Sequence, residues 1–363
     1  MIYALLLLTI YIWPFGQLLT FTHPSFPLTI YLLDVVVLLL SISLIVTKKR
    51  KEIFSSPISK SLAIFLGVAV LSLLVSLKQG ISSGLPLSVF YLLRLIIYPS
   101  LFFAGRYVGF SRLKKPLIVS LGIFTLLCLL QYFIFPDMRY LKNLGFDDHY
   151  FRLIGSFYDP NFTGAVLAGI ALFFIGKDRI YYSLLLIGLL ATTTSRASYL
   201  VFVFCLIYYL FSNKKIKIFL LLLFLGVIIY LIPKPFGEGV NLLRTFSIIS
   251  RIDSWQQGIN LFLEKPFFGW GYNTLRGIDG SRFQIDNSFI YLLATTGIVG
   301  LFSFLNLLRV LFKNLKDTGV RLLIISLLIH SFFNNTLFFI WILSLTWLAL
   351  GLGLEKTKEY KQS

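Results

Sequence analysis

The stretch PLIVSLGIFTLLCLLQYFIF, residues 116–135, decides the fold. It holds 20 residues and no charged side chain. An α-helix rises about 1.5 Å per residue, so a helix of this length crosses the roughly 30 Å of hydrocarbon in a bilayer. Its apolar residues are continuous and not alternating, which indicates a helix and not a strand of a membrane barrel. This stretch is a predicted membrane-spanning helix.

Similar apolar runs recur along the whole chain and predict an all-α polytopic transmembrane helical bundle of about 12 spans, forming a single membrane domain over residues 1–363. The runs fall near 2–21, 27–46, 58–77, 85–104, 116–135, 162–176, 180–194, 198–212, 216–232, 287–311, 320–333 and 336–354. Several runs are shorter than the roughly 20 residues that a perpendicular span needs, so their bounds are soft.

The composition supports a membrane protein. Hydrophobic residues make up 57% of the chain and charged residues only 13%, whereas a soluble domain carries about 25% charged residues. The net charge of +18 comes from short basic clusters between apolar runs, a pattern that signals membrane topology and not nucleic-acid binding. Cys128 and Cys205 each lie inside an apolar run, so we expect packing residues and no disulfide.

The distribution of Lys and Arg predicts the orientation. Placing both termini in the cytoplasm puts 21 basic residues on that side and 11 on the other, which follows the positive-inside rule. The first apolar run has no Lys or Arg before it and no small-residue cleavage site, so we interpret it as a retained span and not a signal peptide.

Two sizeable loops, 136–161 and 233–286, then lie outside the cytoplasm. Within the second, Ser250 to Glu264 has the pattern of a helix, because Ser250 and Asp253 form a capping-box pair and Lys265-Pro266 supplies a stop. One face of this amphipathic helix near 251–264 would carry Ile252, Trp255, Ile259 and Phe262. Such a helix suits the membrane interface or the mouth of a helix bundle.

Arginines on the outer side are candidates for binding phosphate, since a guanidinium offers paired hydrogen bonds to phosphate oxygens. Arg196 lies between two spans in TTTSRAS, Arg152 precedes GSFYDPN, and Arg251 begins the amphipathic helix. Contact with lipid headgroups or ordinary loop solubility would explain them equally simply. The same loop also carries Arg244, Arg276 and Arg282.

Two charges lie within predicted spans, Asp34 and Arg94. Charged residues in a bilayer are costly and usually face the bundle interior or pair, so these two form either a structural ion pair or part of a site. Asp147-Asp148-His149 is a weak metal pattern, and the chain has no P-loop, dinucleotide fingerprint or zinc spacing. We therefore expect no metal and no cofactor.

Four stretches together resemble the O-antigen ligase and polymerase superfamily of bacterial lipid-linked glycan ligases and polymerases. They are RLIGSFYDPN at 152–161, TSRAS at 194–198, RIDSWQQGINLFLEKPFFGWGYNT at 251–274 and DNSFIYLLATTGIVGL at 286–301. The order of the four and the long loop before the tenth span carry the likeness, which covers roughly the whole chain. One position departs from it, since Asp286 stands where O-antigen ligases usually have a histidine.

The resemblance implies a membrane glycosyltransferase of the C type in the bacterial inner membrane, with no metal. The donor would be a glycan on undecaprenyl pyrophosphate, and the acceptor a hydroxyl of a second glycan or of another, lipid-linked acceptor. Arg196 and Arg251 would meet the pyrophosphate, and Asp286 would orient or deprotonate the hydroxyl. The further binding residues would be Arg152, Asn161, Trp255, Tyr272, Asn287 and His330, with His330 or His149 as alternative bases.

A polysaccharide flippase or another secondary transporter is the main alternative. Transporters commonly show internal repeats and polar sites at the bilayer midplane. This chain has no recognisable repeat, and its polar residues concentrate in the outer loops. That distribution favours chemistry at the membrane surface.

Overall fold

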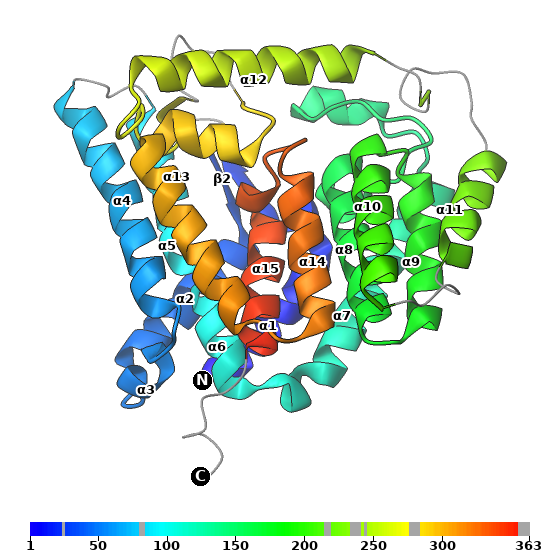
Figure 1. Cartoon of the computed structure of the whole chain (residues 1–363), viewed down its shortest axis with the longest axis horizontal. Coiled ribbons are helices and arrows are strands. Elements are labelled where there is room, and N and C mark those ends of the chain that lie inside the picture. The colour runs from blue at the N-terminus through cyan, green and yellow to red at the C-terminus, as the bar shows by residue number, and fades with distance from the viewer. Residues whose placement is uncertain are drawn as a thin grey trace.

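The computed structural model describes residues 1–23, 26–79, 84–213, 219–232, 241–242, 245–275 and 284–354. Figure 1 shows most of the helices running side by side, with α12 lying across one end of the bundle and the N-terminus at the opposite end. We call the first of these the α12 end. The elements are α1 (Ile2–Ile12), η1 (Trp13–Leu18), β1 (Thr20–His23), β2 (Phe26–Tyr31), α2 (Leu32–Val46), α3 (Arg50–Phe54), α4 (Ser59–Lys78), α5 (Leu85–Ile97), α6 (Ser100–Val108), α7 (Phe110–Ile134), η2 (Arg139–Leu144), η3 (Gly155–Phe157), α8 (Pro160–Gly176), α9 (Ile180–Thr192), α10 (Arg196–Asn213), α11 (Phe219–Leu231), α12 (Phe246–Glu264), α13 (Ser288–Asn314), α14 (Thr318–His330), η7 (Thr336–Phe338) and α15 (Ile340–Gly353).

The chain is a helical membrane protein. Within the described residues, four helical segments are long and apolar enough to cross a bilayer: Ser59–Lys78, Leu85–Val108, Phe110–Ile134 and Ser288–Asn314. The other apolar helices are shorter, between 10 and 17 residues, so the number of 12 spans stays a prediction. Large apolar side chains such as Ile118 and Leu126 of α7 are exposed, as expected for a surface that lipid covers.

The predicted bounds of the first two spans, 2–21 and 27–46, were wrong. The helix α1 ends at Ile12, and Pro14 is the second residue of the short 3-10 helix η1 that follows. The proline ring and its missing N–H do not continue an α-helix. The strands β1 and β2 then pair as an antiparallel hairpin, with Thr20 opposite Tyr31. The sequence pattern had not predicted this hairpin.

Asp34 of α2 and Arg94 of α5 form a buried ion pair. The Arg94 Nη2 atom lies 2.6 Å from Asp34 Oδ2, and Nε lies 3.0 Å from Oδ1. The hydroxyl of Tyr98 and the backbone N–H of Tyr31 donate to the same carboxylate at 2.8 and 3.0 Å. Buried charges are tolerated when their hydrogen bonds are satisfied. The pair thus joins α2 to α5 as a structural element.

The helix α13 is broken at Gly297, whose φ of 67° lies in the left-handed region. The turn after α12 fills the break: Trp270 and Gly271 donate backbone hydrogen bonds to Ala294 and Thr295, each at 2.9 Å. A Cβ at Gly297 would lie 2.1 Å from the carbonyl oxygen of Phe267. The glycines of FFGWG and of α13 therefore permit a close backbone contact that fixes the end of α12.

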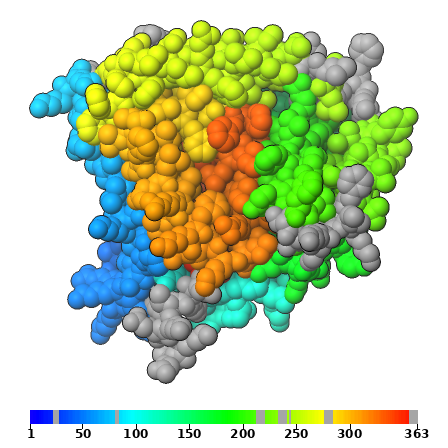
Figure 2. All heavy atoms as spheres, in the orientation of Figure 1, coloured from blue at the N-terminus to red at the C-terminus, as the bar shows by residue number. Residues whose placement is uncertain are grey.

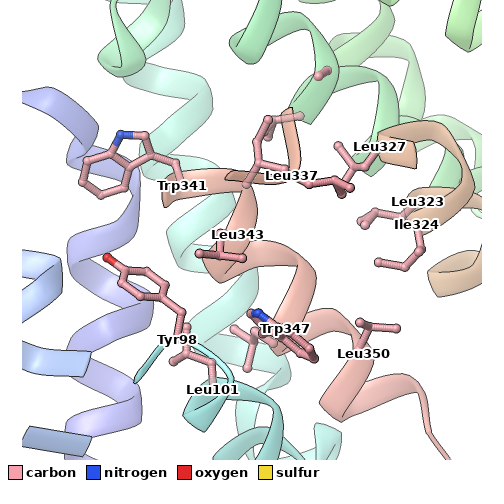
Figure 3. Packing of buried hydrophobic residues seen from close by; sticks show 14 of the residues in the cluster. Tyr98, Leu101, Leu323, Ile324, Leu327, Leu337, Trp341, Leu343, Trp347 and Leu350 are labelled. Carbon is pink, nitrogen blue, oxygen red and sulfur yellow. The ribbon is translucent and has the colours of Figure 1, made fainter. Parts of the chain in front are cut away.

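The core lies around α15. Trp341, Leu343 and Trp347 of α15 pack between α14 and the α5–α6 segment, which contributes Tyr98 and Leu101 (Figure 3). All five side chains are buried. This packing sets the α14 and α5–α6 helices around one central helix.

The helix α12 covers the expected range but differs in detail from the prediction. It begins at Phe246, so Ser250 and Asp253 lie inside it and are not a capping box. Its buried residues are Ser254 and Gly258, whereas Ile252 and Ile259 are 54% and 44% exposed. Gly258 lets the helix approach Ile290, since a Cβ there would lie 2.6 Å from the Ile290 Cγ2 atom. Residues 233–240, 243–244 and 276–283 of the predicted loop lie outside the described part.

Candidate active site

Three helix N-termini meet beneath α12, those of α8, α10 and α13. Asp159 caps α8 and accepts from the backbone N–H groups of Asn161 and Phe162 at 2.6 and 3.0 Å. Asn287 caps α13 in the same way, accepting from Phe289 and Ile290. Helix N-termini carry partial positive charge and favour anions. The α12 end of the bundle is therefore suited to a negatively charged ligand.

Arg196 is the first residue of α10 and reaches up to the segment that leads into α12. Its Nη1 atom donates to the Leu242 carbonyl at 3.1 Å, and Nη2 donates to the Ser247 hydroxyl at 2.6 Å. The side chain is half-buried. Both partners are neutral, so neither hydrogen bond pairs the guanidinium with a negative charge.

Arg251 approaches the same region from α12. Its Nη2 atom donates to the Asn334 Oδ1 atom at 3.3 Å, in the connection after α14. Burial lowers its pKa, while the negative charges of Asp286 and Asp159 raise it and the charge of Arg196 lowers it further. These influences place the two arginines and two carboxylates in one electrostatic neighbourhood.

Asp286 is held by α12 through its backbone. Its N–H donates to the Ser254 hydroxyl at 2.8 Å, and its carbonyl accepts from the Trp255 indole at 3.0 Å. Within the described part of the chain, no hydrogen bond or ion pair engages its carboxylate. Burial raises the pKa of this carboxyl, and Arg251 opposes that rise. A half-buried carboxylate with a raised pKa is suited to accept a proton.

Arg152, Asn161 and His330 form a layer beneath Arg196. Arg152 is buried and its Nε donates to the Thr194 hydroxyl at 2.8 Å, in the turn before α10. The Ser195 hydroxyl donates to Asn161 at 3.0 Å, and His330 is fully buried. The structure thus brings these three predicted residues to the site, but as its supporting layer.

The aromatic and amide candidates have structural contacts as well. Tyr272 is only 3% exposed and packs edge-on against Tyr291 and Phe338, so it belongs to the core. The side-chain oxygen of Asn287 is engaged in capping α13. Trp255 is half-buried and fastens Asp286 to α12. Of these three, Trp255 is the one whose side chain bonds Asp286.

Two residues of the site, Asp159 and Asn334, were not predicted from the sequence. Asp159 was part of the GSFYDPN stretch, and an Asp before Pro at a helix start is a recognisable cap signal. Asn334 carried no such signal, because its role depends on Arg251 arriving from α12. Arg244, Arg276 and Arg282 lie outside the described residues. Across the described ranges, no three His, Cys, Asp or Glu side chains gather as a metal site requires.

Residues 181–305 match the family model described as O-antigen ligase. The resemblance to the O-antigen ligase and polymerase superfamily is confirmed. The region matched to this family runs from α9 into α13 and contains Arg196, Arg251 and Asp286. Arg152, Asn161 and His330 lie outside it. No curated protein matches the chain.

Proposed function

We propose that the chain is a membrane glycosyltransferase of the C type, working as an O-antigen ligase or a polysaccharide polymerase in the bacterial inner membrane. It transfers a glycan from undecaprenyl pyrophosphate to a hydroxyl of an acceptor glycan at the α12 end, which is the extracytoplasmic face. The observation that carries the proposal is the meeting of Arg196, Arg251 and Asp286 beneath α12.

Asp286 and the two arginines have different roles in the reaction. The acceptor oxygen attacks the anomeric carbon of the donor sugar, and the bond from that carbon to the pyrophosphate oxygen breaks. Asp286 takes the hydroxyl proton, while Arg196 and Arg251 stabilise the negative charge that develops on the leaving pyrophosphate. The N-termini of α10 and α13 add positive potential at the same place, whereas the carboxylate of Asp159 already caps that of α8. The products are the lengthened or newly joined glycan and undecaprenyl pyrophosphate.

An apolar crevice supports a lipid-linked donor. Side chains of α4, α13, α14 and α15 line it, among them Phe65, Leu308, Leu327 and Trp347. It reaches Leu337 in η7, the residue after Thr336, so its upper end adjoins the supporting layer of the site. In Figure 2 the residues that follow α14, in deeper orange-red, lie between α13 and α10 below α12. Hydrocarbon chains suit such a surface.

The transporter alternative receives no support from the buried charges. A transport site at the bilayer midplane would draw on Asp34 and Arg94. These two residues are committed to each other and to Tyr98.

The test is a transfer assay with the purified protein. Incubation with an undecaprenyl-pyrophosphate-linked glycan, with and without a second acceptor, should lengthen the chain for a polymerase or label the acceptor for a ligase. Arg196→Ala and Arg251→Ala should abolish transfer while the protein still inserts into the membrane. Wild-type protein that transfers nothing from any lipid-linked donor, or full activity in both variants, would overturn the proposal.

A further inference from the structure

His330 lies between α10, which carries Arg196, and the connection after α14, which bonds Arg251 of α12. It ends α14 with its side chain fully buried. The Nε2 atom lies 3.2 Å from the Ser198 hydroxyl, and Nδ1 lies 2.7 Å from the Thr336 hydroxyl. Both ring nitrogens are therefore engaged, one toward α10 and the other toward the connection that precedes α15.

The hydrogen bonds continue from these two hydroxyls to the neighbourhood of each arginine. On one side, Ser198 lies 2.9 Å from the hydroxyl of Ser195, the residue before Arg196. On the other side, the Thr336 hydroxyl donates to the Asn334 carbonyl at 3.4 Å, and the Asn334 side chain accepts from Arg251. His330 thus lies between Ser195, the residue before Arg196, and Asn334, the residue that bonds Arg251, and the backbone completes the connection at each end.

Apolar packing does not account for a histidine here. The neighbouring residues of α14 are Leu327, Leu328 and Ile329, and a leucine at 330 would bury apolar surface with no polar group to satisfy. The imidazole instead needs a donor on one side and an acceptor on the other, and the hydroxyls of Ser198 and Thr336 can fill either role. Hydrogen bonds at both ring nitrogens hold α14, α10 and the connection after α14 in one arrangement.

We propose that His330 is a positioning residue that fixes the separation between Arg196 and Arg251. This inference rests on the proposed function, in which both guanidinium groups meet one pyrophosphate. His330 is fully buried with both ring nitrogens engaged, so we place its action through the two arginines. A misplacement of about 1 Å between groups that bind one transition state costs on the order of 100-fold in rate. The spacing of the arginines is therefore the property that the network protects.

The test compares His330→Leu with His330→Gln in the transfer assay. His330→Leu removes both hydrogen bonds at similar volume, and we expect the KM for the lipid-linked donor and the inhibition constant of inorganic pyrophosphate to rise at least about 10-fold. The KM for the acceptor should change little. His330→Gln keeps a donor and an acceptor and should recover part of the donor affinity. Ser326→Ala, which removes a buried hydroxyl bonded only within α14, is the matched control and should behave as wild type.

Two further measurements separate positioning from simple stability. Ser198→Ala removes the hydroxyl that faces the Nε2 atom and leaves the histidine in place. It should raise the KM for the donor and the inhibition constant of pyrophosphate, and it provides a test if His330→Leu fails to fold. Arg196→Ala has no transfer to inhibit, so pyrophosphate binding is measured directly by calorimetry. Adding His330→Leu to Arg196→Ala should weaken this binding little beyond Arg196→Ala alone, because only one arginine remains and the spacing no longer matters. Unchanged donor KM and pyrophosphate inhibition in folded His330→Leu and Ser198→Ala, with wild type active, would overturn the inference and leave the proposed function standing. An inactive wild type would instead sink the proposed function.

Discussion

The pKa of the Asp286 carboxyl depends on neighbouring charges to which it is not hydrogen-bonded. Burial raises its pKa, Arg251 lowers it, and the negative charge of Asp159 raises it again. A base must be deprotonated, so the transfer rate should fall as the pH drops through this pKa. Asp159→Asn removes one negative charge and keeps a good helix cap. The pKa of Asp286 should then fall, and the acidic limb of the rate against pH should move to lower pH.

The control for this shift is Asp148→Asn. Asp148 is exposed in the loop before α8, and its charge is not among those that act on Asp286. Its pH profile should match wild type, whereas Asp286→Asn should lose the acidic limb together with most of its turnover. A limb that stays in place or moves to higher pH in Asp159→Asn would remove Asp286 from the role of base.

The ion pair of Asp34 and Arg94 should matter for stability and not for transfer. Arg94→Leu leaves the Asp34 carboxylate buried without its partner, which costs about 3–5 kcal/mol of unfolding free energy. Replacing both residues by leucine removes the stranded charge and should recover most of the loss. Thermal unfolding in detergent, with activity measured per folded molecule, checks both statements. Lost activity at wild-type stability in Arg94→Leu would instead place the pair in the site.

The position of α12 depends on one small residue. A Cβ at Gly258 would lie 2.6 Å from Ile290 and 3.1 Å from Ile285, so Gly258→Ala should lift the middle of α12 away from the start of α13. Arg251 lies on α12, and Asp286 is hydrogen-bonded to it. A displacement of α12 by about 1 Å should therefore lower the transfer rate by about 10- to 100-fold. Gly122→Ala in α7, where a Cβ would meet no atom within 4 Å, is the matched control. Equal rates for the two variants in membranes with equal protein content would show that α12 tolerates displacement.

Helices were predictable from the chain where the bilayer alone determines them. The apolar run 116–135 became α7, Phe110–Ile134, because no water is present in hydrocarbon to satisfy an open backbone. The break at Gly297 was not predictable in this way. It depends on the FFGWG turn donating to Ala294 and Thr295, which is a tertiary contact between segments that are distant in sequence.

The residues of the candidate site also fall into those that the sequence indicates and those that only tertiary contacts reveal. Arg196, Arg251 and Asp286 could be proposed from the sequence because the family motifs contain them, and their roles stay a prediction. Asn334 and the bridging role of His330 were not, because they follow from the way α12, α10 and α14 meet. Residues of this second kind are polar and buried, so composition alone does not distinguish them from ordinary core positions.

The orientation of the whole molecule can be tested by labelling. The structure places α12 at the opposite end from the N-terminus (Figure 1), and the distribution of basic residues predicts that the α12 end faces outward. Both native cysteines, Cys128 and Cys205, are buried, so a new cysteine on the surface reports its own side. Asn260→Cys on α12 should react with a membrane-impermeant maleimide in intact cells, and Lys51→Cys on α3 only after permeabilisation. The reverse pattern would place the three charged site residues in the cytoplasm, where a lipid-linked donor presented outside could not reach them.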